Sequence, residues 1–161
     1  MSVTNTNTAL ANFENGGRLL IETGSGTYLN LLNIKAGTLR MRIGRRRVVY
    51  YNDRNKIQPP RLAEQQPSML ELDVRATAAY GSSDIMKLLL PIPTTDAAPT
   101  VKLHVEIPTY DGSSTVLRWT FAKAIVERPI DFEAGPDDDA WKLRFTDAAE
   151  MAEPTSGSPL A

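Results

Sequence analysis

The clearest indication of the fold of this chain is in residues 101–125, VKLHVEIPTYDGSSTVLRWTFAKAI. Apolar and polar side chains alternate from Val101 to Ile107, which is the pattern of a strand with one face on a core. The Asp111-Gly112 pair tolerates positive φ and predicts a tight turn. The return segment repeats the alternation and is expected to place on one face Leu117, Trp119, Phe121 and Ile125. Together these features predict an antiparallel β-hairpin.

The same period of two occurs elsewhere in the chain. It recurs in residues 69–76, in residues 140–145 and, around an arginine-rich middle, in residues 37–51. The apolar side chains expected to face inward from the first two of these segments are Leu70, Leu72, Val74, Ala76, Trp141, Leu143 and Phe145. Several alternating segments separated by turn residues are typical of an antiparallel β-sandwich or barrel.

One further segment has a helical pattern. Ser82 or Ser83 can cap a first helical turn, and Pro91 prevents the helix from continuing. The apolar residues between them are spaced to share one helical face. The expected fold is therefore mainly β: an antiparallel β-sandwich or barrel with one short flanking α-helix at about 82–90 and a long loop at about 44–66.

The length and the two ends of the chain predict one domain with two arms. A chain of 161 residues is long enough to bury a core without disulfides or metals. Residues 1–16 are polar and rich in Thr and Asn, whereas residues 148–161 are rich in Pro, Ser, Gly and acids. Neither end can build a core alone. We expect a β-domain at 17–147, with arms that fray in a monomer or become ordered against neighbouring subunits.

Composition excludes several classes of function. The chain has no cysteine and one histidine, so thiolate chemistry and the usual zinc sites cannot form within one subunit. A formal net charge of −1 is unlike the basic excess of dedicated nucleic-acid binders. No stretch approaches the roughly 20 apolar residues of a membrane-spanning helix, and the polar N-terminus is not a secretory signal. We expect no membrane anchor.

No catalytic group can be nominated. His104 lies mid-strand between Lys102 and Glu106 without a nucleophile nearby in sequence, which favours a surface or interface role. The consecutive acids Asp137, Asp138 and Asp139 lack the alternate spacing of a calcium loop and favour a solvated turn. The sequence therefore predicts a protein that is not an enzyme and has neither cofactor nor metal.

The densest basic cluster is the run Arg45-Arg46-Arg47. It could bind phosphate groups with tyrosines stacking on bases, as in a small β-barrel nucleic-acid-binding module. It could equally pair with acids of a neighbouring subunit, around residues 137–139 or at Glu150 and Glu153, and we favour this second interpretation. The candidate subunit and ring contacts are Arg45, Arg46, Arg47, Tyr50, Tyr51, Arg54, Lys56, Arg61, Asp137, Asp138 and Asp139.

Several phrases, in their order along the chain, resemble the major tail tube proteins of long-tailed, non-contractile bacteriophages. The resemblance covers roughly residues 17–147 and includes no single diagnostic motif. The phrases are IKAGTLRM at 34–41, YNDRNKIQPPR at 51–61, EQQPSMLELDVR at 64–75, the segment 82–90, the hairpin 101–125 and RPIDFEAG at 128–135.

This resemblance implies a β-sandwich with a flanking helix that forms hexameric rings stacked into a hollow tube. Such a tube belongs to the virion tail, is assembled in the host cytoplasm, encloses the tape measure protein and conducts the genome. It also implies tail terminator and distal tail proteins as partners. DNA should pass without specific binding, because fixed cations along the channel would resist its movement. Tubes of contractile tails and of type VI secretion share the architecture and remain alternatives.

Overall fold

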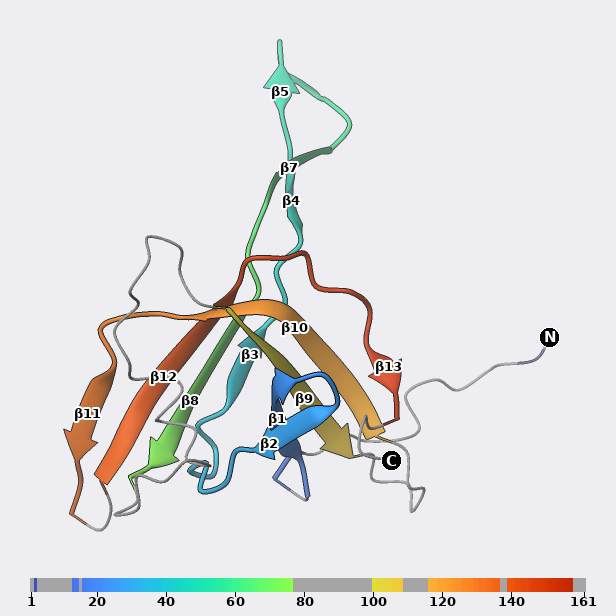
Figure 1. Cartoon of the computed structure of the whole chain (residues 1–161). Coiled ribbons are helices and arrows are strands. Elements are labelled where there is room, and N and C mark those ends of the chain that lie inside the picture. Colours follow the sequence, from blue (N-terminus) through green and yellow to red (C-terminus); the bar gives the residue numbers. More distant parts are fainter. Residues whose placement is uncertain are drawn as a thin grey trace.

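The computed structural model describes residues 2, 13–14, 16–76, 100–108, 116–136 and 139–157 (Figure 1). No residue in these ranges is helical. The first seven strands are β1 (Arg18–Gly24), β2 (Thr27–Asn30), β3 (Arg40–Arg42), β4 (Arg46–Val49), β5 (Asn52–Asp53), β6 (Lys56–Ile57) and β7 (Arg61–Gln65). The others are β8 (Met69–Arg75), β9 (Val101–Pro108), β10 (Val116–Val126), β11 (Asp131–Ala134), β12 (Asp139–Asp147) and β13 (Thr155–Ser156).

Most strands belong to one antiparallel sheet with the order β2-β1-β9-β10-β12-β8-β3, in which β11 also pairs with β12 and β13 with β10. The long strand β10 joins two layers, since it pairs mainly with β9 along its first half and with β12 over its last three residues. We call β2-β1-β9-β10 the β9 layer and β11-β12-β8-β3 the β8 layer (Figure 1). The mainly β, antiparallel fold predicted from the sequence is confirmed.

The core lies between the inner faces of these two layers. Its fully buried side chains include Leu19, Ile21, Leu70, Leu72, Leu103, Val105, Phe121, Leu143 and Phe145. Burying one side chain of this size stabilises the fold by about 1.5–3 kcal/mol. The inward faces predicted for 69–76 and 140–145 are confirmed, with Trp141 packed against the edge of the cluster.

A β-bulge in β10 changes one predicted face. The pairing with β9 shifts register between Phe121 and Ala124. Beyond the shift, Ala124 is buried and Val126 packs against the core, whereas strict alternation assigned that face to Ile125. The prediction for Ile125 was therefore wrong, because one extra residue reverses the faces of all that follow.

Two other sequence predictions concern segments outside the sheet. The expected long loop at 44–66 is instead a β-hairpin made of β4, β5, β6 and β7, which projects from the sandwich (Figure 1). Alternation of apolar and polar residues is difficult to recognise there, because the strands have only two to five residues and are separated by polar and proline residues. The expected helix at 82–90 and the turn at 110–114 lie outside the described residues.

Parts of both predicted arms contact the sandwich. Phe13 packs against the core, and the side chain of Glu14 accepts a hydrogen bond from the backbone N–H of Gly37 at 2.9 Å. Met151 is buried in the core at 3 % exposure, and β13 pairs with β10 at Leu117 and Arg118. Residues of the C-terminal segment thus contribute packing and backbone pairing.

The second face of the β9 layer contains two buried polar side chains, Glu106 and His104. Glu106 is 1 % exposed and forms an ion pair with Arg18, whose Nη2 lies 2.8 Å from its Oε2. His104 is 4 % exposed; its Nδ1 lies 3.1 Å from Oγ1 of Thr120 and its Nε2 lies 3.5 Å from Oε2 of Glu22. The expectation of a histidine at a surface or interface was wrong, since His104 is buried within the single chain. Alternation identifies the opposite face of a strand but not whether that face is covered.

Candidate functional site

The hairpin at 44–66 is the first candidate site. β4 pairs with β7 through Arg46↔Gln65 and Val48↔Leu62, and β5 pairs with β6 toward the tip. The tip residues Arg54 and Asn55 have φ of 51° and 63°. Positive φ at both central residues is typical of a two-residue hairpin turn whose twist matches its strands. The segment is therefore an ordered β-ribbon with little contact to the core.

The base of the hairpin is fixed by several hydrogen bonds. The N–H of Gly44 donates to Oγ of the buried Ser68 at 2.9 Å. Nη1 of Arg45 donates to the carbonyl of Met151 at 2.8 Å, and its Nη2 lies 3.7 Å from Oε1 of Glu153. The pairing of Arg45 with Glu153 that the sequence analysis expected between subunits therefore forms within one chain. The strands β4 and β7 leave the sandwich in a defined direction.

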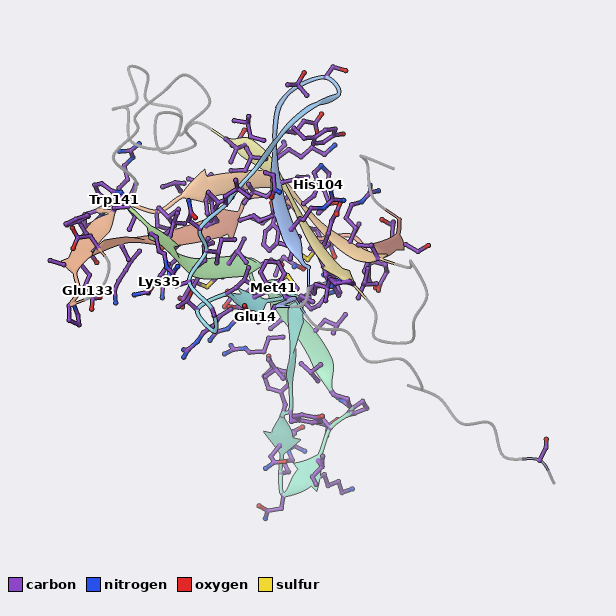
Figure 2. All side chains as sticks on the ribbon, turned by 90° about the horizontal axis from the view of Figure 1, so that it is seen from below. Glu14, Lys35, Met41, His104, Glu133 and Trp141 are labelled. Carbon is purple, nitrogen blue, oxygen red and sulfur yellow. The ribbon has the colours of Figure 1, made fainter. Side chains whose placement is uncertain are left out.

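Exposed apolar side chains concentrate on this hairpin. Seven large hydrophobic side chains are exposed in the described part of the chain, and two of them, Leu32 and Phe132, lie elsewhere. The five on the hairpin are Val48 (47 % exposed), Tyr50 (70 %), Tyr51 (52 %), Ile57 (82 %) and Leu62 (58 %). A local concentration of exposed apolar groups is typical of an interaction surface. Figure 2 shows the side chains of the hairpin standing clear of the sandwich.

The hairpin is also basic, although the chain is not. Residues 44–66 contain six Lys and Arg against two Asp and Glu, whereas the remainder contains twelve against seventeen. The Arg46 guanidinium donates to the carbonyl of Ala63 across the hairpin at 3.0 Å. The exposed hairpin residues that the sequence analysis nominated are Arg46, Arg47, Tyr50, Tyr51, Arg54, Lys56 and Arg61.

Of the three acidic candidates, only Asp139 belongs to the described residues, and it does not lie at the hairpin within one chain. Asp137 and Asp138 lie outside the described residues. Asp139 begins β12 opposite Ala134 of β11, on the flank of the β8 layer away from β3 and the hairpin (Figure 1). Any contact between Asp139 and the arginine run would have to form between copies.

A second surface, which the sequence analysis missed, is the outer face of the β8 layer. Its four strands alternate in charge, and we call their outward residues the charge columns. The columns are Arg40 and Arg42 on β3, Glu71 and Asp73 on β8, Lys142 and Arg144 on β12, and Asp131 and Glu133 on β11. A groove of about 620 Å³ runs over this face and is lined by members of all four columns.

Ion pairs link neighbouring columns. Nζ of Lys142 lies 2.7 Å from Oε2 of Glu133, and Arg144 pairs with both Glu71 and Glu127. The hydrogen bond from Lys142 lowers the pKa of Glu133, and the same bond raises the pKa of Lys142. These charges are satisfied by each other within the sheet. In the sequence, each charge column is a pair of like charges separated by one residue, as in RMR, ELD, KLR and DFE. This pattern is the signal that could have revealed the columns.

The described residues were also compared with the ligand pattern of a metal centre. In the described ranges, no three His, Cys, Asp or Glu side chains gather to hold a metal ion. Burial lowers the pKa of His104, with further contributions from the cations Arg118 and Lys102, so its neutral form is favoured. Among these same residues, none forms a helix able to span a membrane.

The comparisons with known proteins supply no relative: no protein-family model matches the chain, and no curated protein matches it.

Proposed function

We propose that this protein is a non-catalytic structural subunit that assembles with its own copies into stacked rings, forming the hollow tail tube of a long-tailed bacteriophage. In this proposal the tube encloses the tape measure protein and later conducts the genome. The single observation that carries the proposal is the projecting hairpin 44–66, which displays five of the seven exposed large hydrophobic side chains of the described chain.

The argument from the hairpin is energetic. A two-stranded ribbon is marginally stable by itself in water, so apolar side chains displayed on it contribute little to folding the monomer. Burial against another surface removes that apolar area from water and is favourable at roughly 25 cal/mol per Å². A subunit that bridges to the next ring requires such a projecting element. The proposal assigns this role to the hairpin.

The charge distribution supports the same proposal. A conduit for DNA should not bind it, because every phosphate neutralised by a fixed cation adds affinity. The arginines of the hairpin then belong to subunit contacts, and a neutral or acidic surface lines the channel. On the outer face of the β8 layer, Lys142 and Arg144 are ion-paired with acids of the same chain, which makes these two cations less available to phosphate groups.

The test is electron microscopy and sedimentation of the purified protein over a wide concentration range. We expect tubes or stacked rings from the wild type. A double variant, Tyr50→Ser with Ile57→Ser, should remain folded and lose stacking. The control Leu32→Ser, at a 65 % exposed site outside the hairpin, should assemble normally. Normal tubes from the double variant would contradict the role of the hairpin.

A second candidate function is favoured by one observation: the exposed Tyr50 and Tyr51 share the hairpin with exposed Arg47 and Arg54. Aromatic rings beside cations can bind single-stranded nucleic acid by stacking and charge. This alternative predicts that a monomer binds oligonucleotides with an affinity that falls steeply as salt is raised. Fluorescence anisotropy of a labelled oligonucleotide distinguishes it from the tube proposal.

A further inference from the structure

The charge columns end differently on the two flanks of the β8 layer. From flank to flank they run basic on β3, acidic on β8, basic on β12 and acidic on β11. Figure 1 shows β3 and β11 on opposite flanks of this layer, and Figure 2 shows Glu133 and Trp141 at one side of the molecule with Met41 near its middle. A second copy placed beside the first would continue this alternation without a break.

We propose that the β3 edge of one copy pairs with the β11 edge of the next, antiparallel and head to tail, so that Arg40 and Arg42 meet Asp131 and Glu133. This inference deepens the proposed function, on whose self-assembly it rests. The partner is a second copy of this chain, and the interface is argued from three independent features of the layer.

Strand direction is the first feature. Every neighbouring pair in the layer is antiparallel, and the layer has four strands. An even number of alternating strands leaves β3 and β11 running in opposite directions. The β11 strand of a second copy in the same orientation therefore lies antiparallel to β3, so the ladder of backbone hydrogen bonds can continue across the boundary.

The sign of the edge charges is the second feature. Two β3 edges would place arginines opposite arginines, and two β11 edges would place acids opposite acids. Like charges opposite each other across a strand pair are destabilising, whereas opposite charges are favourable. The edges thus disfavour two-fold dimers and favour head-to-tail contacts, which close into rings when the rotation between copies allows.

The stagger of the layer is the third feature. Phe132 of β11 lies opposite Trp141 of β12, whereas Met41 of β3 shares a row with Leu70 and Phe145. The row of paired residues that contains Phe132 crosses β12 at Trp141, and the row that contains Met41 crosses β12 at Phe145. The two edges are therefore offset by four residues along the strands. Four residues of stagger over four strands correspond to a strand tilt of about 35°, which is in the range of closed barrels.

Charged edge residues have another common role, which is to prevent unwanted pairing between sheets. That role requires charge on each edge but no particular sign. The ion pair of Glu133 with Lys142 does not remove Glu133 from the surface, since 60 % of its side chain is exposed. Lys142 already lies in register with both Asp131 and Asp73, one on each side. The proposed contact gives Asp131 and Glu133 the same two-sided arrangement.

The test reverses each edge separately and then together. The first variant is Arg40→Glu with Arg42→Glu, and the second is Asp131→Arg with Glu133→Arg. Each alone brings like charges together, so we expect the concentration for half-maximal assembly in analytical ultracentrifugation to rise about tenfold or more. An equimolar mixture of the two variants should assemble, because each supplies the edge that the other needs. A chain carrying both reversals should also assemble.

A control separates these effects from net charge. Arg75→Glu with Lys123→Glu changes the charge as much as the first variant does, at exposed positions away from both edges, and should assemble like the wild type. Circular dichroism should show every variant folded. Failure of the mixture and of the combined reversal to recover, with all chains folded, overturns the edge pairing. If all charge-reversed variants assemble like the wild type, the edge pairing is also overturned but the proposed function is not. A wild type that stays monomeric at every concentration overturns both.

Discussion

The sandwich and the hairpin 44–66 use the same apolar residue types in opposite ways. In the sandwich, Phe121 and Phe145 are fully buried between two layers. On the hairpin, Tyr50 and Ile57 are 70 % and 82 % exposed. The apolar side chains that stabilise the fold therefore lie in the sandwich, and those left exposed on the hairpin are the ones to which we assign the subunit contacts in our proposal. The sandwich can fold by burying its own surface, whereas apolar groups on the hairpin can be buried only by another molecule.

The largest expected effect is the loss of stability when a buried aromatic side chain of the sandwich is removed. Phe121→Ala removes a fully buried ring and should lower the free energy of unfolding by about 3–5 kcal/mol. Tyr50→Ala, at an exposed hairpin position, should change it by no more than about 0.5 kcal/mol. Urea denaturation of the two variants under conditions where the protein is monomeric makes the measurement. Equal losses would show that the hairpin contributes to the core.

A smaller effect is expected where the C-terminal segment joins the sandwich. Met151 is 3 % exposed and belongs to the core cluster. Met151→Ala should therefore destabilise the fold by about 2–3 kcal/mol, and the volume-conserving Met151→Leu should cost less than about 1.5 kcal/mol. Thermal denaturation of both variants checks the difference. No loss in the alanine variant would place the segment among the dispensable arms.

The junction between the two regions gives the next effect. A Cβ at Gly44 would lie 2.0 Å from the carbonyl oxygen of Gln66 and 2.4 Å from the carbonyl carbon of Pro67. Both are backbone atoms, so Gly44→Ala must move the base of the hairpin and should cost about 1–3 kcal/mol. Arg46→Ala, two residues further along the chain at the start of β4, serves as the control with a change of about 0.5 kcal/mol. Wild-type stability in Gly44→Ala would mean that the base is adaptable.

The smallest effect concerns the polar face of the β9 layer. Burial lowers the pKa of His104 below its ordinary value of 6.5, and the groups that face it are Glu22, Tyr28, Lys102, Arg118 and Thr120. The unfolded chain therefore binds a proton more readily than the folded one. The contribution of neutral His104 to the free energy of unfolding should be fully present above pH 6.5, and the free energy of unfolding should fall as the pH drops below this value. Denaturation of wild type and His104→Gln at pH 7.5 and 5.5 tests this, since the variant should lose less stability than the wild type.

The sequence patterns that proved reliable are those of strands covered on one side. The alternation in 69–76 and 140–145 predicted the buried faces of β8 and β12, because solvent on one face requires a strict period of two. Prediction failed where that condition did not hold. A bulge displaced Ile125, a covered second face buried His104, and the short strands of the hairpin were assigned to a loop.

The charge columns illustrate the same limit. Each like-charge pair can be read from the sequence, since alternation places residues i and i+2 on one face. The order of the four strands cannot be read in this way, because β3, β8 and the consecutive pair β11 and β12 are far apart along the chain and meet only in the sheet. The sequence therefore contained the charges but not their arrangement.

Three properties follow from the sequence: the chain is an antiparallel β protein, most core strands have an identifiable inward side, and the arginines cluster near residue 45. These properties depend on neighbours along the chain, and local sterics and the period of the strand express them directly. Tertiary structure alone decided that 44–66 projects as a hairpin, that His104 and Glu106 are buried, and that the β8 layer ends in edges of opposite charge. These properties depend on which distant strands come together, and long-range packing determines that pairing.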